Sequence, residues 1–577
     1  MHANTKQPQF DILEFDVIII GGGATGFGIA LESILRGYKT LLLEAHDFGS
    51  GASSKSTKLL HGGIRYLKNF DFSLVKEGLD EREYFLHNAS NIAKMHEYII
   101  PCYSYREQFM YIIGVLVYNI LAKLNWRTIV KTLLSPFKSH KPYSSYNSVA
   151  SKSFTNNRIY ISKQELIQLM PLIKQKNLKC GIAYTDGQFD DTRMIISLMT
   201  KFISLGGVCY NYTKVTEFIK NTKNEIIGVI AGSNNKHFMS KVVINATGVF
   251  ADELINLSNI AHQKNTNHST TNQQEQHKEH KSNNITPAQG SHIILSNNLL
   301  KVSKAIVIPK TPDKRILFIL PWLYNTVVVG TTDIKVPNPA IEPHATDTEV
   351  ELILESLNNY TKTTITTKDI ISIFSGQRPL VHDHGNQQNN KTAKISRKHK
   401  IIIATNKLVS VIGGKWTIYR KMGFDTLELL LKRNLLVPKL ASPNNLNAID
   451  STKSAKLSKE CQLSQQNNQA YPLTVYGENY KKIFEIQAEL NDYSKLHDEL
   501  PYYTAEVVYH VRFEMAQNII DVLARRTHAI LLNPIVCLKI LTKVAQIMAF
   551  ELKYDELWQK NQIFEATNFI KHYIYNK

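Results

Sequence analysis

Three glycines near the start of the chain have the spacing of a phosphate-binding turn. Gly21, Gly23 and Gly26 form the pattern G-x-G-x-x-G, and Glu44 follows 18 residues after the last of them. In such a turn the first glycine permits a tight bend, the second lets the backbone approach a pyrophosphate, and the third lets helix and strand pack closely. Glu44 can accept hydrogen bonds from ribose hydroxyls. The pattern predicts a dinucleotide site.

The segments around these glycines are those that the motif needs. Residues 17–20 form a β-branched apolar run that is too short for a typical helix, which indicates a buried parallel strand. Helically spaced apolar residues then lead to Gly37, and a second strand is expected at 40–43. The N-terminus of the helix between them offers N–H groups and a positive dipole end to phosphates. We therefore expect a Rossmann-type α/β domain.

The composition limits the class of protein. A chain of 577 residues should form about two to four domains, and 43% hydrophobic residues are ample for a large core. The net charge of +19 fits an anionic substrate, an anionic membrane surface or a nucleic acid. The 5 cysteines include no C-x-x-C pair, which indicates a reducing compartment and no disulfide framework.

No segment has the pattern of a membrane span or a targeting signal. Residues 1–16 contain neither a hydrophobic signal region nor the Arg-rich, acid-poor pattern of a transit peptide. No apolar run approaches the ~18 residues that a transmembrane helix needs. Residues 109–122 are the longest uncharged candidate. We expect a chain that does not cross a bilayer.

Apolar periodicity gives a coarse map of the rest of the chain. Helical patterns are expected at 74–98, 109–134, 162–170, 194–205, 349–360 and from 417 onward. Strands are expected at 208–212, 214–218, 226–231, 241–245, 291–295, 305–309, 316–321, 326–330 and 407–412, and a strand followed by a turn is expected at 180–191. The polar stretch 262–284 cannot bury a core, and its four histidines lack regular ligand spacing, so we predict a solvated loop and no metal site.

Several blocks, in order along nearly the whole chain, resemble the FAD-dependent glycerol-3-phosphate dehydrogenase family. They are GGGATGFGIA (21–30), LLLEAHDFGSGASSKSTKLLHGGIRYL (41–67), INATG (244–248), GSHIIL (290–295), LPWLYNTVVVGTTD (320–333), SGQRPL (375–380), GGKWTIYRKM (413–422) and the helical C-terminal block 505–533. The resemblance implies a flavoprotein of the amino-acid-oxidase type, with a Rossmann-type FAD domain, an antiparallel-sheet substrate domain and a helical C-terminal domain.

The resemblance also implies an activity and a set of partners. The expected reaction is the FAD-dependent oxidation of sn-glycerol 3-phosphate to dihydroxyacetone phosphate, with electrons passed to a membrane quinone. The expected place is the cytoplasmic face of a membrane, as a peripheral protein, or the cytoplasm, with a mitochondrial location left open. We expect an anionic membrane surface and no nucleic acid as partners, and a homodimer is compatible with the assignment.

The substrate residues follow from the resemblance and agree with the chemistry of a phosphate ester. A phosphate needs cationic, preferably forked, donors. By resemblance Arg65 and Arg378 bind the phosphate, with Tyr66 and Thr417 alongside. Arg397 is a further expected substrate residue, although the polar segment before it departs from the family pattern.

Three residues are predicted to take part in the chemistry. The resemblance places Lys415, after a Gly-Gly turn, near the flavin and the substrate, where a cation would stabilise developing negative charge. Oxidising a secondary alcohol also requires a base for the hydroxyl proton, and His61 and His292 are both candidates.

The cofactor residues are predicted from the fingerprint and from the matching blocks. They are Gly21, Gly23, Gly26, Glu44, Ser54, Ser56, Lys58, Leu59, Gly62, Ala246, Gly248, Asp333, Gly413 and Gly414. The expected FAD-binding domain is discontinuous and comprises 1–100, 151–260 and 381–440. A substrate-binding cap is expected at 101–150 and 285–380, a linker at 441–500 and a helical C-terminal domain at 501–577.

Two other functions remain open from the sequence. A glycerol-3-phosphate oxidase would use the same flavoprotein with oxygen as acceptor, but such oxidases carry a long insertion before the Gly-Gly-Lys motif, and here the segment 380–396 is short. A tRNA-modifying or other nucleic-acid-binding flavoprotein would fit the charge of +19, but the basic residues are scattered and form no single stripe.

A segment near residue 120 has the pattern of a helix that lies on a membrane. Lys123, Arg127 and Lys131 recur every four residues and stack on one helical face. Apolar residues and Trp126 surround them, and the uncharged run 109–122 precedes them. A core helix with a solvated lysine face is the alternative. A quinone dissolved in lipid favours the membrane reading.

Overall fold

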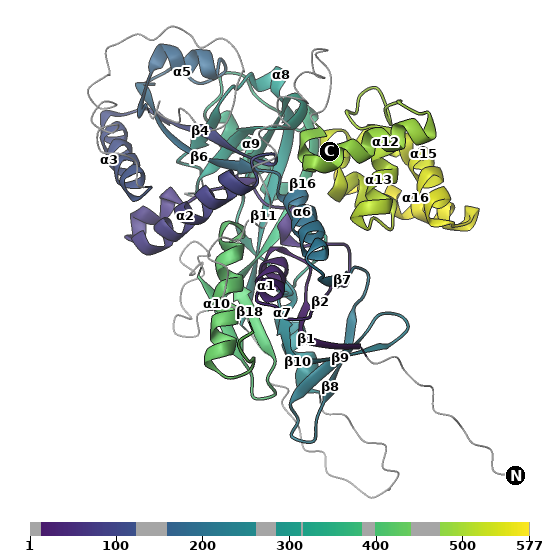
Figure 1. Cartoon of the computed structure of the whole chain (residues 1–577). Helices are drawn as coiled ribbons and strands as arrows, with labels where there is room; N and C mark the ends of the chain where they lie inside the picture. The colour runs from purple at the N-terminus through teal and green to yellow at the C-terminus, as the bar shows by residue number, and fades with distance from the viewer. Residues whose placement is uncertain are drawn as a thin grey trace, which may run out of the picture.

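The structure, a computed structural model, describes residues 13–122, 158–260, 284–312, 315–382, 398–439 and 473–575. It has three parts, as Figure 1 shows. A sheet with the N-terminal strand lies at the bottom of that view, a larger sheet extends above it, and a bundle of C-terminal helices lies to the side.

The first sheet has eight strands, and its centre is parallel. Its main order is β17-β18-β10-β1-β2-β7, with β9 paired to β10 and β8 to β9. Neighbours β18, β10, β1, β2 and β7 run parallel, and the remaining pairs are antiparallel. The strand bounds are β1 Leu13–Ile20, β2 Thr40–Leu43, β7 Val208–Tyr210, β8 Val215–Lys220, β9 Ile226–Ala231, β10 Lys236–Asn245, β17 His399–Ile403 and β18 Val409–Gly413.

The central strand β1 is buried on both faces, as its apolar run predicts. Val17 and Ile19 pack in one core with Phe27 of the helix that follows, and Ile18 and Ile20 pack in another core on the opposite face. Successive side chains of a strand point to opposite faces of the sheet. When both faces are covered, every side chain is buried, so the strand needs an unbroken apolar run.

Helices cover this sheet at close range. They are α1 Ala24–Leu35, α6 Asp191–Ser204, α7 Ala251–Asn259 and α10 Tyr419–Lys432. Helices α1 and α10 cross through glycines: a Cβ on Gly28 would lie 2.4 Å from the carbonyl oxygen of Tyr419, and a Cβ on Gly423 would lie 2.3 Å from that of Gly28. Only residues without a side chain allow these two backbones to approach so closely.

The second sheet has ten strands and is largely antiparallel. Its main order is β15-β11-β14-β13-β12-β4-β6-β3, with β16 paired to β11 and β5 to β6, and the β12–β4 pair is parallel. The strand bounds are β3 Leu59–Leu60, β4 Ala93–Cys102, β5 Tyr160–Ser162, β6 Cys180–Phe189, β11 Ile285–Ser296, β12 Ala305–Ile308, β13 Leu317–Pro321, β14 Thr326–Gly330, β15 Ile334–Lys335 and β16 Ile370–Val381.

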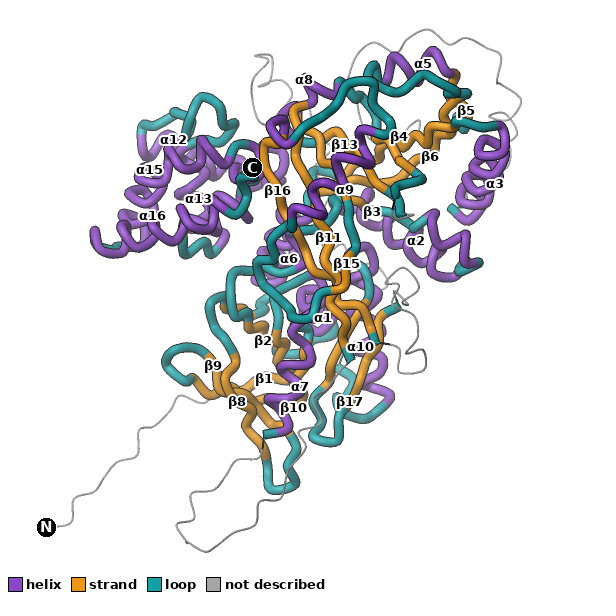
Figure 2. The backbone as a smooth tube through the Cα atoms, turned by 180° about the vertical axis from the view of Figure 1, so that it is seen from behind, coloured by secondary structure: helices purple, strands orange, loops and turns teal. Residues whose placement is uncertain are grey.

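Helices flank the second sheet and form the C-terminal part. Around the sheet lie α2 Phe72–Asn88, α3 Tyr105–Leu121, α5 Lys163–Leu169, α8 Asn297–Leu300 and α9 Asp347–Asn358. Figure 2, seen from behind, shows the C-terminal helices on the other side of β16. They are α12 Tyr480–Leu490, α13 Thr504–Glu514, α14 Ala529–Leu532, α15 Pro534–Leu552 and α16 Glu556–Lys571, with a π-helical turn, η9 Asp521–Arg526, between α13 and α14.

Three expectations about element and domain boundaries differ from the structure. The helix expected at 74–98 ends at Asn88, because residues 93–102 pair with β6 on one side and β12 on the other and form strand β4. Strands β4 and β6 lie in the second sheet, although 93–100 and 180–189 were assigned to the cofactor domain. Residues 473–490, expected as linker, contain a helical turn and α12, which pack on α13.

The expected fold class is confirmed: a Rossmann-type domain, a largely antiparallel second sheet and a helical C-terminal part. In the part of the chain that the structure describes, no helix has both the length and the apolar character that crossing a bilayer requires. The predicted interfacial residues 123–134 and residues 262–283 of the low-complexity stretch 262–284 lie outside the described residues.

Candidate active site

A cavity of about 1670 Å³ opens where the two sheets meet. At one end lies the turn between β1 and α1, in which Gly21 has φ +114° and a Cβ would be 2.6 Å from the carbonyl oxygen of Ala246. Gly23 is the N-cap of α1 and has no side chain that could cap the helix. The first turn of α1 contains no acidic residue. The turn therefore offers a helix N-terminus to an anion in the cavity.

Most of the residues predicted from the sequence line this one cavity. They are Gly21, Gly23, Glu44, Ser56, Leu59, His61, Arg65, Tyr66, Ala246, Gly248, His292, Asp333, Arg378, Gly413, Gly414, Lys415 and Thr417. The predicted residues that are described but do not line it are Gly26, Ser54, Lys58 and Gly62. Arg397 lies outside the described residues.

Glu44 stabilises the glycine-rich turn as well as facing the cavity. Its Oε2 accepts a hydrogen bond from the N–H of Gly22 at 2.6 Å, and its Oε1 accepts one from the N–H of His46 at 2.9 Å. Burial raises the pKa of Glu44, against the lowering effect of these two hydrogen bonds. The carboxylate thus orients the turn before any ligand arrives.

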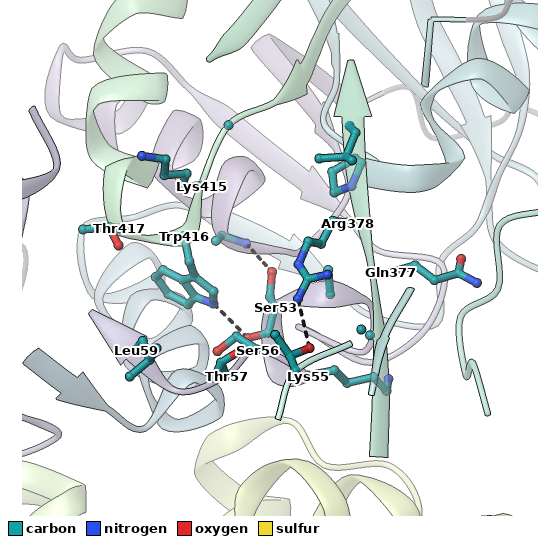
Figure 3. A pocket seen from close by; sticks show the side chains of 18 of the residues that line it. Ser53, Lys55, Ser56, Thr57, Leu59, Gln377, Arg378, Lys415, Trp416 and Thr417 are labelled. Atoms are coloured by element: carbon teal, nitrogen blue, oxygen red, sulfur yellow. Dashed lines mark hydrogen bonds between the residues drawn. The ribbon is translucent and has the colours of Figure 1, made fainter. Parts of the chain in front are cut away.

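Residues 45–58, the cofactor loop, follow Glu44 and fold back on the turn. The N–H of Gly49 donates to the carbonyl oxygen of Gly22 at 3.0 Å, and the N–H of Ala24 donates to Ser53 Oγ at 3.0 Å. The indole N–H of Trp416 donates to the carbonyl oxygen of Ser53 at 2.8 Å. Figure 3 shows the Trp416 indole pointing toward the segment that carries Ser53. The loop is therefore held between α1 and the Gly-Gly-Lys segment.

The end of the cofactor loop is fixed by a buried ion pair. Lys58 Nζ lies 2.6 Å from Asp191 Oδ1, and both side chains are 0% exposed. The N–H and hydroxyl of Ser56 donate to the other carboxylate oxygen at 3.0 and 2.7 Å. The side chain of Lys58, predicted to bind the cofactor, is instead engaged with α6 behind the cavity wall.

Gly26 and Gly62 act through packing. A Cβ on Gly26 would lie 1.8 Å from the carbonyl oxygen of Gly21, so only glycine allows α1 to start so close to the turn. The N–H of Gly62 donates to the hydroxyl of Tyr118 on α3 at 2.9 Å. Both residues therefore shape the wall without lining it.

The cations predicted to meet the substrate come from three segments. Arg65 and Tyr66 lie on the short helix η2 Ile64–Asn69, which begins after Gly63. Gly63 has φ +85°, and a Cβ there would be 2.3 Å from the Tyr66 ring. Lys415 Nζ lies over the face of that ring, 4.1 Å from its centroid. A cation over an aromatic face is stabilised by the ring quadrupole.

Arg378 enters from strand β16. Its guanidinium donates to Thr331 Oγ1 at 3.1 Å and forms an ion pair with Asp333 at 3.2 Å. A Cβ on Gly290 would lie 2.5 Å from the guanidinium, so this glycine makes room for it. Figure 3 shows Arg378 pointing toward the cofactor loop, whereas Gln377 points away from it.

His292 lies deeper in the wall. Its ring stacks on Phe374 with centroids 4.5 Å apart, and Nε2 is 3.0 Å from Thr57 Oγ1. Burial, together with the nearby Arg378 and Lys58 cations, holds the pKa of His292 well below its usual range. The ring is therefore neutral near pH 7.

Comparisons with known proteins give the family. Residues 16–419 match the model of the FAD dependent oxidoreductases, and residues 445–559 match the C-terminal domain of alpha-glycerophosphate oxidase. The probable mitochondrial glycerol-3-phosphate dehydrogenase of Dictyostelium discoideum is 32% identical over 598 residues, 98% of this chain and 86% of that one. The chain belongs to the FAD-dependent glycerol-3-phosphate dehydrogenase family.

Other members and two solved structures extend the comparison. The mitochondrial glycerol-3-phosphate dehydrogenase of Rattus norvegicus is 29% identical over 96% of this chain and 73% of its own. The glycerol-3-phosphate dehydrogenase of Bacillus halodurans complexed with FAD has the same fold, with TM-score 0.70, 22% identity and coverage of 97% and 95%. L-alpha-glycerophosphate oxidase of Mycoplasma pneumoniae with FAD bound has TM-score 0.53 and 17% identity over 75% of this chain and 98% of that one.

The residues of this glycerol-3-phosphate dehydrogenase family member fit its cofactor, FAD. The cavity volume of about 1670 Å³ exceeds the ~300–1,000 Å³ of a typical small-molecule pocket, as a dinucleotide plus a substrate requires. Gly248 has φ +63° with open space around its Cβ position, next to the strand end at Ala246. The helix N-terminus at Gly23 would hold the phosphates of the cofactor. Among the described residues, no group of three His, Cys, Asp or Glu could hold a metal ion.

Sequence reasoning missed Lys55, Thr57, Thr331 and Trp416, all of which line the cavity. Each of them lies inside one of the blocks that resemble the family. The resemblance was therefore visible at these positions, but it did not indicate what these residues do. Lys55 is buried, and its Nζ forms an ion pair with Glu342 at 3.0 Å. Such a contact joins segments far apart in the sequence and cannot be found from spacing.

Proposed function

We propose that this protein oxidises sn-glycerol 3-phosphate to dihydroxyacetone phosphate with FAD and passes the electrons to a membrane quinone. The observation that carries the proposal is the shared cavity: Arg65, Arg378 and Lys415, from three separate segments, line the same space as the glycine-rich turn. A cofactor site and an anion site in one cavity suit a phosphorylated substrate. The names of the relatives support the choice of glycerol 3-phosphate.

Arg65 and Arg378 bind the substrate phosphate in this proposal. Forked guanidinium groups give charge-assisted, bidentate hydrogen bonds to phosphate oxygens. Arg378 is already oriented by Thr331 and Asp333, so little conformational entropy is lost when the phosphate arrives. The side chain remains 26% exposed, which leaves it accessible from the cavity.

Proton removal and charge stabilisation fall to different residues. Bound FAD supplies the two-electron acceptor for the alcohol carbon. His61 lines the cavity and is partly exposed, whereas His292 is buried with a depressed pKa and is the weaker base. We therefore assign the hydroxyl proton to His61 and an orienting contact through Thr57 to His292. Lys415 stabilises negative charge that develops during the transfer.

An apolar exposed face beside the cavity supports the quinone and the membrane. On α3, Phe109 is 68% exposed, Ile113 45% and Ile120 51%, and these positions lie on one helical face. Ile113 and the 78%-exposed Phe70 also line the cavity. A lipid-soluble acceptor would reach the site from a bilayer that covers this face. In this proposal the protein is a peripheral membrane protein.

The reaction is tested on the purified holoprotein. Glycerol 3-phosphate added without oxygen should bleach the flavin absorption, and a soluble quinone should restore it. Hydrogen peroxide formed in stoichiometric yield under air would instead identify an oxidase.

Lys415→Ala should slow flavin reduction in a single turnover while leaving FAD content unchanged; an unaltered reduction rate would remove Lys415 from the mechanism. Replacing His61 by Ala should slow reduction more than His292→Ala does.

The membrane face is tested with anionic liposomes. Phe109→Ser with Ile120→Ser should reduce co-sedimentation while activity with a soluble dye is retained. Phe564→Ser is the matched control, because Phe564 is 68% exposed on α16 but far from α3 in Figure 1. The basic residues Lys123, Arg127 and Lys131, outside the described residues, are tested by replacement with Gln. Equal pelleting of all variants would overturn the docking face.

A further inference from the structure

The C-terminal helices contact the cofactor loop without entering the cavity. Among the described residues that line the cavity, none belongs to 473–575. The same helices nevertheless reach both ends of the cofactor loop through buried polar contacts. Figure 1 shows the helices beside α6 and β16, and Figure 2 shows them from behind. Two sets of contacts account for this docking.

The first set is centred on Asp47, three residues after Glu44. Arg526 donates to Oδ2 and Oδ1 of Asp47 at 2.7 and 2.9 Å, and Arg525 donates to Oδ2 at 2.5 Å. Asp47 and Arg526 are 0% exposed. The two arginines, which outweigh the opposite effect of burial, hold the pKa of Asp47 well below its usual range. Both arginines belong to η9, so a single helical turn of the C-terminal part binds the start of the loop.

The second set is centred on Lys55, near the other end of the loop. Lys55 Nζ forms an ion pair with Glu342 at 3.0 Å and donates to the carbonyl oxygen of Ile341 at 3.2 Å. The hydroxyl of Tyr573, just after α16, donates to the other carboxylate oxygen of Glu342 at 2.6 Å. Lys55 and Ile341 both line the cavity. Tyr573 therefore acts on the wall through Glu342.

Between these two points the loop carries one backbone N–H and one side-chain hydroxyl that fix the glycine-rich turn. Gly49 donates to Gly22, and Ser53 accepts from Ala24 at the start of α1. A displacement of Asp47 or Lys55 would be passed to these contacts, since only a few residues separate them. The geometry of the pyrophosphate and ribose site thus depends on groups that never touch the ligand.

We propose that the C-terminal domain completes the FAD site from outside, with Arg525, Arg526 and Tyr573 as positioning residues for the cofactor loop. The inference rests on FAD occupying this cavity. Loss of either set of contacts should loosen the loop, raise the FAD dissociation constant and accelerate FAD release. The turnover number at saturating FAD should stay close to that of the wild type, because the residues around the substrate are unchanged.

The sharpest test compares two tyrosines at the end of the chain. Tyr573→Phe removes the hydroxyl from Glu342. Tyr575→Phe removes a similar contact, a 3.0 Å hydrogen bond to Asp347 that leads to α9 and away from the loop. FAD dissociation constants are measured by flavin fluorescence on refilled apoprotein. We expect an increase of about fivefold to tenfold for Tyr573→Phe and none for Tyr575→Phe. Equal values for both variants would overturn the proposal.

A second comparison uses two buried carboxylates at the same interface. Asp47→Asn should raise the FAD dissociation constant more than about tenfold, because a buried partner of two arginines is neutralised. Glu514→Gln breaks an ion pair with Arg193 at 2.7 Å, equally buried but not on the loop. It should lower thermal stability with an unchanged FAD constant. Equal weakening of FAD binding by Glu514→Gln would refute a specific role of the loop. Wild-type protein that binds no FAD would instead refute the proposed function.

Discussion

Within the described part of the chain, the arginine cluster at the C-terminal interface and the arginine cluster around the cavity differ in what they contact. At the C-terminal interface Arg525 and Arg526 meet Asp47 at 2.5–2.9 Å, and Arg193 meets Glu514. Around the cavity Arg378 contacts a threonine hydroxyl, a carbonyl oxygen and Asp333 at 3.1–3.3 Å. Similar residue types are thus tightly ion-paired in one region and held by looser, mostly neutral groups in the other.

The difference separates structural charges from functional ones. A cation whose charge is fully neutralised by a protein carboxylate has little affinity left for a ligand anion. Arg378 is held by one carboxylate at 3.2 Å and by two neutral oxygens, so it is oriented but keeps part of its charge for the ligand. Exposure follows the same division, because Arg526 is 0% exposed and Arg378 is 26% exposed. We expect substitutions in the first cluster to change stability and those in the second to change catalysis.

The largest effect on stability is expected for Arg526→Ala. It would leave Asp47 buried with one fewer cation and the carbonyl oxygen of Glu514 without the donor it has now. Removing one partner of a buried ion pair typically costs about 3–5 kcal/mol of unfolding free energy. Denaturant unfolding of holoprotein measures it. A loss below about 1 kcal/mol would show that this cluster resembles a surface ion pair and would break the comparison.

Arg378→Ala should instead act on turnover. Losing a charge-assisted phosphate contact should cost about 1.5–3 kcal/mol of transition-state stabilisation. This corresponds to a roughly ten- to 150-fold decrease in kcat/KM for glycerol 3-phosphate. FAD content and the unfolding midpoint should change less than in Arg526→Ala, because Arg378 is 26% exposed and its contacts to Thr331 and Asp333, at 3.1 and 3.2 Å, are longer than those of Arg526 to Asp47. Steady-state kinetics and the flavin-to-protein ratio are the measurements. Unchanged kinetics with lost stability would exchange the roles of the two clusters.

The ease of prediction from sequence also divides the molecule. The glycine-rich turn and Glu44 lie within one β-α-β unit of about thirty residues, so their spacing alone reveals both fold and chemistry. Arg65, Arg378 and Lys415 were placed by motif resemblance, because strands from distant segments bring them together. Asp47 and Arg526 were missed, since a buried ion pair between residues 47 and 526 leaves no periodic signal.

The prediction of secondary structure from the sequence was wrong where pairing with distant strands decides the local structure. Residues 93–98 continue a helical pattern in sequence, but two neighbouring strands recruit them into the second sheet. Lys58 was predicted as a cofactor residue, and its ammonium group pairs with Asp191. From sequence alone, a lysine that faces a ligand cannot be told from a lysine that is ion-paired inside the protein. The distinction requires the position of the carboxylate with which the lysine pairs.

Acid should weaken the contact between α6 and the C-terminal helices, in which Asp190 pairs with His528. Burial by itself raises the pKa of Asp190, but His528, 2.9 Å away, and the N–H of Arg193 outweigh it and lower the pKa from 3.8 to about 2. A depressed pKa stabilises the native state above pH 4, and this contribution, about 2 kcal/mol, is lost as pH falls toward 2. Unfolding free energies at pH 5 and pH 3 measure it. Asp190→Asn, which keeps the α6 cap, should flatten the difference; an equal pH slope in both proteins would contradict the assignment.

The smallest effect is expected where charges pair on the surface of the same domain. Arg512 contacts Glu489 at 2.7 Å and Glu551 at 2.6 Å, geometry as good as that of Arg526, but its side chain is 31% exposed and that of Glu489 is 53% exposed. Water already solvates the charges of Arg512 and Glu489, so their pairing adds little beyond what the unfolded chain has, and only Glu551, at 7% exposed, is shielded from water. Arg512→Ala should cost less than about 1 kcal/mol, and high salt should reduce that cost further. Denaturant unfolding at low and high salt tests both statements. A cost equal to that of Arg526→Ala would mean that hydrogen-bond geometry, and not burial, sets the strength of ion pairs in this protein.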